Sequence, residues 1–441
     1  MSAARDAMRQ LRDFPSAIAG LALVGALFVV SGVVIVTIPY SDAVRLWRGG
    51  EGVWDESPEN ARPTWFRLFM SKKLPETIVR DTKQDGKTVS KLADGTQLMT
   101  ASLRFDFSFD EPPNEVCLWL NAKYKDAQPF VTLKWKKPNG QLVEFEERTP
   151  GAHDRYQISR DEKLRTRLNV SSLEEALFCQ NGELLRGTYE LLVEGILFEP
   201  DADLDARLVV YGKLHGWAGT DGERRDLGIA LLWGTPFALA IGLLAAVGTT
   251  LFALAIAAIG SWYGGRLDAA IQRITEVNAM LPRLVLLIMI GMFYSKSIWV
   301  MLASVILLST FGLGIKSYRS IFLSLKEAPY IEAARAYGAG NFRIIFYYLI
   351  PRVIPMLVPG FVVAIPEFVF LEATLNIVGV GDPDVITWGR LLHEAYSNDA
   401  LFKGYYYRVL EPAACLMITG ISFAMIGFAL DRIFNPRLRN V

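Results

Sequence analysis

The chain alternates between long uncharged runs and segments rich in charge. Residues 14–41 contain no charged side chain, and neither do residues 227–265. About 20 apolar residues suffice for a helix that crosses the hydrocarbon core of a bilayer. Further apolar runs follow at 284–295, 297–315, 353–380 and 412–430, and the first of these is expected to continue back through Pro282 into a helix over 268–280. The pattern therefore predicts a polytopic α-helical membrane protein with six transmembrane helices.

Basic residues indicate how these helices are oriented. Arg5, Arg9 and Arg12 precede the first run, which we interpret as a retained span rather than a cleaved signal peptide, so the N-terminus is expected in the cytoplasm. Six spans return the C-terminus to the same side, and the outer hairpin near Lys296 holds a single basic residue. The loops then expected to face the cytoplasm carry Arg266, Arg273, Arg283, Lys316, Arg319, Lys326, Arg335, Arg343, Arg352, Arg432, Arg437 and Arg439.

In the polar block between the first two spans, apolar residues do not form long runs but recur at every second position in several segments. Apolar and polar residues alternate from Leu103 to Asp110, as in a strand with one buried face. Residues 131–136 and 141–146 flank Pro138-Asn139-Gly140, which is typical of a hairpin. The block is therefore predicted to be β-rich and sandwich-like. Further elements are expected at 189–193 and 207–211 (strands), at 171–175 (a capped helix) and at 63–79 (an amphipathic helix near the membrane surface).

These patterns predict three parts. Residues 1–41 would be the cytoplasmic N-terminus and first span, residues 42–222 an extracytoplasmic β-rich domain, and residues 223–441 a helical core with the other five spans. The chain has 46 basic and 46 acidic residues, a balance that argues against a nucleic-acid-binding protein. No GxxxxGK[ST] sequence occurs, so we expect no ATPase motif in the chain.

Candidate chemistry is sparse in the polar block. His153 and His215 lack the spacing of metal ligands, and no nucleophile–base pair or carboxylate pair suggests catalysis, so no metal site is expected. Cys117 and Cys179 would lie in a compartment that permits disulfides. A bridge between them and two free thiols both remain open at this point.

A loop between the fourth and fifth spans has the clearest pattern. Residues 328–351 are expected to form a helix, a bend at Gly338, and a second helix that ends at Pro351. Ala333 and Ala334 leave a low surface that a groove or another helix could approach. The second helix has an apolar stripe that includes Tyr348. Docking into a partner and packing at the membrane surface are equally compatible with this pattern.

The same residues resemble a known motif. Glu332-Ala333-Ala334 with Gly338 and Pro351 is similar to the EAA loop of binding-protein-dependent ABC importer permeases. Four other segments resemble the C-subunit branch of the dipeptide/oligopeptide type. They are Gly219-Thr220-Asp221 with Arg225-Asp226; Tyr263-Gly264-Gly265 with Asp268, Arg273 and Pro282; Glu372-Ala373 through Gly379-Val380-Gly381 and Trp388-Gly389; and Asn435-Pro436-Arg437-Leu438-Arg439.

The resemblance implies a transport subunit rather than an enzyme. Two permease subunits would form the pathway, an extracytoplasmic binding protein would deliver the solute, and partner ATPase subunits would bind ATP and Mg²⁺, so no cofactor is expected in this chain. Glu332, Ala333, Ala334 and Gly338 would couple it to the ATPase, with Tyr348 and Pro351 in the same loop. The setting would be a prokaryotic inner membrane, with di- or oligopeptides as the solute. Oligosaccharides, nickel chelates and a membrane-anchored sensor are the alternatives.

Several positions depart from the pattern of the branch. Arg224 stands where glycine is usual, Tyr348 where histidine is frequent, and residues 376–378 where the branch has Ser-Phe-Leu. The inserted block is also much larger than is common there. These departures leave the solute open.

Two carboxyl groups fall within the fifth span. Ionisable groups at membrane depth are costly, which makes Glu367 and Glu372 candidates for the pathway or gate. Glu372 has a counterpart in the branch and is expected to form hydrogen bonds near the outer gate. Glu367 could instead be a protonated or paired carboxyl at a subunit interface.

Overall fold

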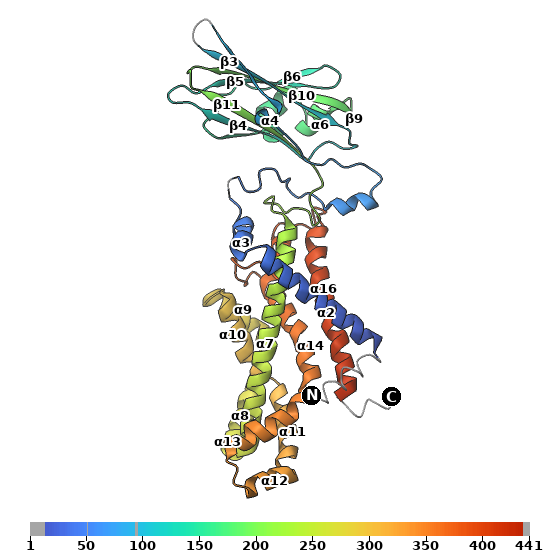
Figure 1. Ribbon diagram of the computed structural model, residues 1–441, viewed down its shortest axis with the longest axis vertical. Coiled ribbons are helices and arrows are strands. Elements are labelled where there is room, and N and C mark those ends of the chain that lie inside the picture. Colours follow the sequence, from blue (N-terminus) through green and yellow to red (C-terminus); the bar gives the residue numbers. More distant parts are fainter. Residues whose placement is uncertain (1–13, 51, 93–95, 435–441) are drawn as a thin grey trace. The chain divides into compact units, whose positions relative to one another are not determined.

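The computed structural model describes residues 14–50, 52–92 and 96–434, which form two compact units (Figure 1). One unit is Gly49–Gly228, and the other combines Met1–Arg48 with Ile229–Val441. Arg5, Arg9 and Arg12 lie outside the described residues, as does the 435–439 segment of the family pattern.

The unit at 49–228 is β-rich, as the sequence predicts. One antiparallel sheet has the strand order β1-β11-β4-β7, a second has the order β2-β3-β10-β5-β6, and β8 pairs with β9. The strands are β1 (Ile78–Asp81), β2 (Thr88–Lys91), β3 (Gln97–Phe107), β4 (Glu115–Lys123), β5 (Phe130–Lys136), β6 (Leu142–Glu144), β7 (Asp154–Gln157), β8 (Cys179–Gln180), β9 (Glu183–Leu184), β10 (Gly187–Leu197) and β11 (Asp203–Tyr211).

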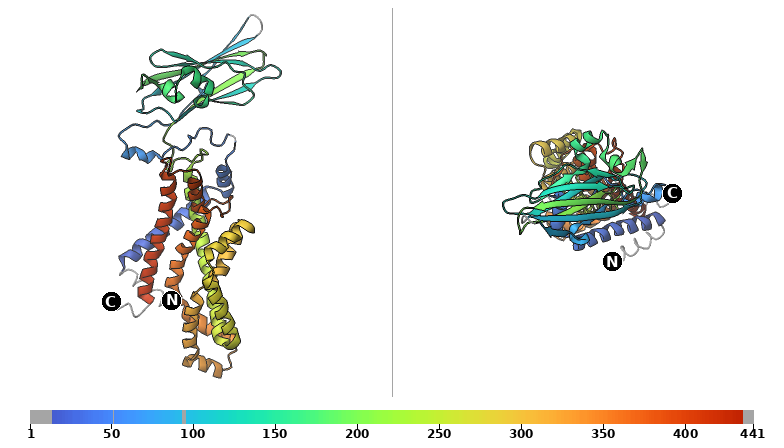
Figure 2. Two further views of the ribbon diagram at one scale, coloured as in Figure 1. Left: turned by 180° about the vertical axis from the view of Figure 1, so that it is seen from behind. Right: turned by 90° about the horizontal axis from the view of Figure 1, so that it is seen from above.

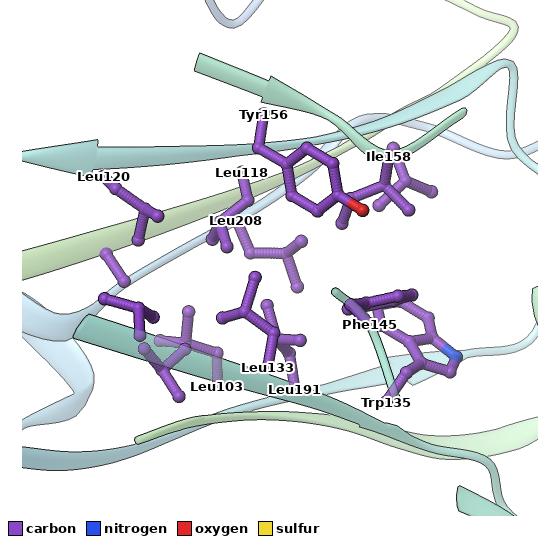
Figure 3. Close-up of a cluster of buried hydrophobic side chains, with 14 of the residues drawn as sticks. Leu103, Leu118, Leu120, Leu133, Trp135, Phe145, Tyr156, Ile158, Leu191 and Leu208 are labelled. Atoms are coloured by element: carbon purple, nitrogen blue, oxygen red, sulfur yellow. The ribbon is translucent and has the colours of Figure 1, made fainter. Parts of the chain in front are cut away.

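Both larger sheets contribute to one hydrophobic core. Along β3 every second side chain is buried, and its Leu103 is paired with Leu191 of β10. Figure 3 shows the leucines of the two sheets pointing toward one another. Leu103, Leu133 and Leu191 come from the five-stranded sheet, whereas Leu118, Leu120 and Leu208 come from the four-stranded sheet. The alternation in the sequence therefore marks the inward face correctly.

Short helices connect the strands. They are η1 (Thr64–Phe69), α4 (Thr82–Asp85), η2 (Ile158–Arg160), α5 (Glu162–Leu168) and α6 (Leu173–Phe178). Ser172 caps α6, because its side chain accepts a hydrogen bond from the Glu175 amide at 3.2 Å. The expected amphipathic helix at 63–79 is wrong. Only the six residues of η1 are helical, since Pro75 interrupts the pattern and the chain then enters β1.

The two ends of the β-rich unit run side by side. The Asn60 amide donates to the Asp221 carbonyl, and the Thr220 amide donates to the Ala61 carbonyl, both at 2.9 Å. Arg62 exchanges further backbone hydrogen bonds with residues 213 and 215. The segment that leads into the unit is thereby paired with the segment that leads out.

The other unit is helical. Its elements are α2 (Pro15–Thr37), α3 (Tyr40–Arg48), α7 (Leu227–Tyr263, whose first two residues belong to the β-rich unit), α8 (Gly265–Met280), α9 (Arg283–Phe293), α10 (Ile298–Thr310), α11 (Gly314–Lys326), α12 (Pro329–Ala336), α13 (Asn341–Arg343), η3 (Ile344–Leu349), α14 (Ile350–Ile377), α15 (Trp388–Ser397) and α16 (Tyr407–Phe434).

Among the described residues, four helices are long and apolar enough to cross a membrane: Pro15–Thr37, Leu227–Tyr263, Asn341–Ile377 and Tyr407–Ile433. The helices α8 and α9 meet at an angle of 81°, and α10 and α11 meet at 48°. The number rises to six if each bent pair counts as one span. The expected passage from 268–280 through Pro282 is thus sharply bent.

Small residues bring the long helices together. In Figures 1 and 2, α16 runs beside both α2 and α14. A Cβ atom added at Gly20 of α2 would lie 2.8 Å from the Ser422 carbonyl oxygen of α16. One added at Gly427 of α16 would lie 2.4 Å from a methyl carbon of Val363. Glycine at these crossings permits the close backbone approach that is typical of membrane helices.

Candidate functional site

The loop at 328–351 forms a helical hairpin. Pro329 occupies the first turn of α12, where its missing N–H removes no intrahelical hydrogen bond. Gly338 has φ of +77° and ends the helix. Its amide donates to the Arg335 carbonyl at 2.9 Å, and the Ala339 amide donates to the Ala334 carbonyl at 3.0 Å. This is the Schellman arrangement, which favours glycine at the left-handed position.

One face of α12 is packed into the chain's own core. Ile331 and Ala334 are buried together with Ile344, Ile345 and Leu349. Ala334 is only 8% exposed, so it cannot offer the close-packing surface to a partner that the sequence led us to expect. Residues three apart lie on the same side of a helix, and Ile331 and Ala334 form the inner side here. Ala333 and Glu332 are exposed.

The hairpin is attached to the end of α7. The Lys326 ammonium donates to the carbonyls of Ser261 and Trp262, at 3.1 and 2.7 Å. The Arg335 guanidinium lies 4.5 Å from the centre of the Trp262 ring. A cation at the C-terminal carbonyls of a helix is favourable, and stacking on tryptophan adds to it. The Arg335 contact connects the hairpin to a long apolar helix, and the Lys326 contacts connect the end of α11, directly before the hairpin, to the same helix.

A second attachment joins α8 to α11. The Arg319 guanidinium donates to both carboxylate oxygens of Asp268, at 2.7 and 2.5 Å. A two-pronged pair of this kind fixes orientation as well as distance. Asp268 follows the Tyr263-Gly264-Gly265 segment, whose two glycines have φ of +65° and +56°. The segment that resembles the family pattern is therefore a tight turn followed by Asp268, whose ion pair with Arg319 fixes α8 to α11.

The outward face of the hairpin is aromatic. Tyr337, at 93% exposure, is next to the bend, and Phe342 and Tyr347 are also exposed. Tyr348 is exposed to a lesser degree, in η3, whose backbone is a π-helix. Pro351 is the second residue of α14 and is exposed. π-helical turns occur frequently at functional sites.

The two carboxyl groups of α14 have different surroundings. Glu367 is exposed on the surface of this chain. The Glu372 carboxylate accepts a hydrogen bond from the side-chain amide of Asn376 at 2.6 Å and another from the Thr387 hydroxyl. It borders two cavities of about 30 and 40 Å³, each large enough for a few waters at most. Positions five apart on a helix point about 140° away from each other, so one pathway-facing side cannot hold both groups.

Around Glu372, sequence reasoning missed a set of contacts that fix the loop between α14 and α15. The Lys296 ammonium donates to the Gly379 carbonyl at 2.9 Å, and the Ile298 amide donates to Asp382 at 3.1 Å. A Cβ added at Gly381 would lie 1.7 Å from Oδ1 of Asn376. The sequence feature that could have indicated these contacts is the Gly379-Val380-Gly381 pattern, because closely spaced glycines mark close approach of the backbone.

The Trp388-Gly389 pair holds three helices together. The Trp388 indole donates to the Leu231 carbonyl of α7 at 2.9 Å. A Cβ added at Gly234 would lie 2.3 Å from that indole, and one added at Gly389 would lie 2.6 Å from Cα of Ala373 in α14. The segment therefore serves helix packing in this chain.

The Gly219-Thr220-Asp221 segment closes the β-rich unit. The Thr220 hydroxyl donates to the Pro58 carbonyl at 2.7 Å and accepts from the Ala61 amide at 2.9 Å. The buried Asp221 carboxylate accepts from Arg225 at 2.6 Å. Cys117 and Cys179 are both free, so of the two alternatives the structure contains the pair of thiols. No group of three metal-binding side chains occurs in the part of the chain that the structure describes.

Comparison with known proteins bears directly on the helical unit. Residues 239–440 match the sequence model of the family described as binding-protein-dependent transport system inner membrane component. The resemblance to such permeases is confirmed. The dipeptide transport system permease protein DppC of Bacillus subtilis is 25% identical over 224 residues, which are 51% of this chain and 69% of the relative.

Two further relatives are similar over a comparable length. The oligopeptide transport system permease protein OppC of Bacillus subtilis is 26% identical over 51% of this chain and 72% of its own length. DppC of Alkalihalophilus pseudofirmus is 29% identical over 51% of this chain and 73% of its own length. The chain therefore resembles permeases of the dipeptide and oligopeptide type over about half of its residues.

Proposed function

We propose that the chain is a transmembrane permease subunit of an ATP-driven ABC importer, with di- or oligopeptides as the solute. The observation that carries the proposal is the helical hairpin at 328–351, found in a domain that is similar to dipeptide permeases. Its inner face is anchored in the chain's own core, while Glu332, Ala333 and Tyr337 remain exposed. A rigid element with a free face is suited to transmit motion from a partner.

In this proposal the hairpin couples the chain to a separate ATPase, which binds ATP and Mg²⁺. Glu332 supplies a polar contact, Ala333 permits close approach, and Gly338 fixes the bend. Ala334 acts from inside by seating α12 on η3. Because Arg335 of the hairpin and Lys326 at the end of α11 both contact the end of α7, movement of the docked ATPase would shift that helix as a rigid body.

The pathway requires a second permease subunit. The cavities beside Glu372 are far too small for a dipeptide. The exposed Glu367 would face the partner or the shared pathway, where a carboxylate favours an amine-bearing solute. An extracytoplasmic binding protein would deliver that solute.

We propose six spans in an inner membrane, with the bent pairs α8–α9 and α10–α11 counted as one each. Both termini would be cytoplasmic, residues 42–222 extracytoplasmic, and residues 223–441 the permease core. The concentration of basic residues in the inner loops supports this topology.

Affinity purification of the tagged chain in mild detergent, followed by mass spectrometry, tests the proposal. We expect a P-loop ATPase, a second permease and a binding protein to be recovered together. A variant with Glu332→Arg and Ala333→Arg should lose the ATPase but keep the second permease. Recovery of the chain alone, or with a kinase and no ATPase, would contradict the proposal.

A further inference from the structure

An exposed cluster of large apolar side chains lies on the β-rich unit, away from its core. We call Trp65, Leu68, Phe69 and Trp217 the aromatic patch. Leu68 is 83% exposed and Phe69 is 79% exposed, and more than two fifths of each tryptophan is also exposed. Exposed clusters of this kind mark sites of interaction with another protein or with a membrane.

The aromatic patch is held by fixed backbone contacts. The Trp65 indole donates to the Trp217 carbonyl at 2.9 Å, and the Thr64 amide donates to the Gly216 carbonyl at 2.9 Å. The Trp65 ring meets Phe69 edge-on at a centroid distance of 6.2 Å. These contacts fix η1 to the segment around Trp217, and Leu68 and Phe69 of η1 are exposed.

The patch lies beside the first turn of a long apolar helix. A Cβ added at Gly228, the second residue of α7, would lie 2.5 Å from the Trp217 indole nitrogen. Five residues later on α7, Trp233 contacts Tyr40 at a centroid distance of 5.2 Å, just beyond the end of α2. Tyrosine and tryptophan are enriched where spanning helices leave the hydrocarbon.

The distance along α7 fits the thickness of a headgroup layer. Five residues of helix correspond to about 7.5 Å. Bilayers are about 40–45 Å thick against a hydrocarbon core of about 30 Å, so each headgroup layer is roughly 5–8 Å thick. If Trp233 lies at the edge of the hydrocarbon, the first residues of α7, Leu227 and Gly228, therefore fall within the headgroup layer.

Charge in the same segment favours lipid over a protein groove. Residues 62–73 contain Arg62, Arg67, Lys72 and Lys73 and no acidic residue. Basic side chains around exposed Trp, Phe and Leu are typical of surfaces that bind anionic membranes. The neighbouring acids Glu76 and Glu111 pair with Arg67 and Lys72 and reduce the attraction only in part.

We propose that the aromatic patch binds the phospholipid headgroup region of the leaflet on the side of the β-rich unit. Leu68 and Phe69 enter the boundary between headgroups and acyl chains, and the basic residues contact lipid phosphates. The unit is thereby a peripheral membrane domain as well as a tethered one. The inference depends on α7 crossing the membrane and not on the solute that is transported.

Spin labelling of the full chain in vesicles of phosphatidylethanolamine and phosphatidylglycerol tests the proposal. The parent carries Cys179→Ala and Cys415→Ala and keeps the buried Cys117. A nitroxide is attached in turn to Leu68→Cys, Phe69→Cys and the control Leu142→Cys, which is 53% exposed on β6 of the same unit. Each label is then exposed to oxygen, which concentrates in lipid, and to a water-soluble nickel complex.

We expect oxygen accessibility to exceed nickel accessibility at residues 68 and 69, and the reverse at residue 142. Equal nickel access at all three sites would place the patch in water and overturn the proposal. Low access to both reagents at residues 68 and 69 would show a protein cover and overturn it as well. All three side chains are exposed, so their replacement removes no core contact.

Discussion

The Arg224 guanidinium forms an ion pair with the Glu115 carboxylate, which is buried in the β-rich unit, while the Arg224 side chain is 12% exposed. Arg224 has φ of +68°, in the left-handed region, at the position where dipeptide-type permeases usually have glycine. It also donates to the Ser57 carbonyl at 3.0 Å and lies 4.4 Å from the centre of the Tyr211 ring. Arginine therefore keeps the backbone shape of the family turn while its side chain joins that turn to β4 and β11.

Replacement of Arg224 should separate backbone strain from ion pairing. Arg224→Ala leaves Glu115 buried without its cation, which destabilises by about 3–5 kcal/mol. Arg224→Gly loses the same pair but relieves the left-handed strain, and should be about 1–2 kcal/mol more stable than the alanine variant. Hydrogen exchange of the β10 and β11 amides in the full chain measures both values.

A second replacement checks the cause of that loss. Glu115→Gln in the Arg224→Gly background removes the unpaired charge and should restore part of the stability. A further loss in the double variant would show that Glu115 has another essential partner.

Gly338 should be required for its backbone conformation and not for its small size. A Cβ at this position would meet no atom within 4 Å, but φ of +77° is strained for alanine by about 1–2 kcal/mol. In the importer proposed above, Gly338→Ala should therefore reduce solute uptake after reconstitution, with less effect from Gly338→Asn, since asparagine tolerates this conformation. ATP hydrolysis should persist without transport.

Gly340 provides the matched control, because its φ is −69° and a Cβ there also meets nothing within 4 Å. Gly340→Ala should leave uptake unchanged. An equal loss of uptake in the Gly338 and Gly340 variants would contradict the role of the bend.

The contact between Gly234 and Trp388 should be sensitive to one methyl group. Gly234→Ala places Cβ 2.3 Å from the indole, and overpacking of this kind costs typically about 1–3 kcal/mol. Gly25→Ala on α2, where nothing lies within 4 Å, is the control and should be neutral or slightly stabilising. Melting temperatures of the purified chain in detergent compare the two. Equal melting temperatures would show that α7 and α15 can move apart freely.

The two thiols of the β-rich unit should differ in reactivity. Cys117 is fully buried, whereas Cys179 is partly exposed, and burial raises the pKa of both thiols. Maleimide should modify Cys179 slowly and leave Cys117 unmodified until the unit unfolds. Peptide mapping by mass spectrometry measures the modification. A peptide containing Cys117 bridged to Cys179 in the non-reduced sample would contradict the free-thiol arrangement.

Acid should weaken the β-rich unit through His215. Burial lowers the pKa of its ring below the usual 6.5, and the nearby Asp226 opposes this shift. The unfolded chain then binds the proton more readily, so the stability contribution is complete above about pH 6.5 and is lost as the pH falls through the folded-state pKa. The protection factors of the β11 amides, which are corrected for the intrinsic pH dependence of exchange, should fall on acidification, and His215→Gln should reduce that dependence. If the pH dependence of stability is the same in the His215→Gln variant, groups other than His215 cause it.

The β-rich character and the strand positions were predictable because alternation is a local property. The stretch from Leu103 lies in β3, and the segments around Gly140 pair as β5 and β6, with Lys136 opposite Leu142. The long apolar helices were predictable for a similar reason, since bilayer thickness imposes a length on them. The 81° bend between α8 and α9 was not, because a proline marks a break without setting its angle.

The features that could not be predicted from the sequence depend on contacts between residues that are far apart in the chain. Ala334 looked like an open surface, but the π-helical η3 covers it. Arg224 looked like a departure from the family, and only its pairing with Glu115, 109 residues away, gives the reason for it. The helix expected at 63–79 had a suitable apolar pattern, but Pro75 and the pairing of β1 outweigh that preference.

The paired ends of the β-rich unit explain how a chain can carry a domain of this size between two of its helices. The Asn60 amide and the Asp221 carbonyl are 2.9 Å apart, so the chain enters and leaves the β-rich unit at almost one point. A module whose ends coincide imposes no stretch on its host, which is why insertion is tolerated at such sites. Removal of residues 61–220 would leave two chain ends so close together that a short glycine bridge could join them, as expected of a unit that can be deleted or moved as one piece.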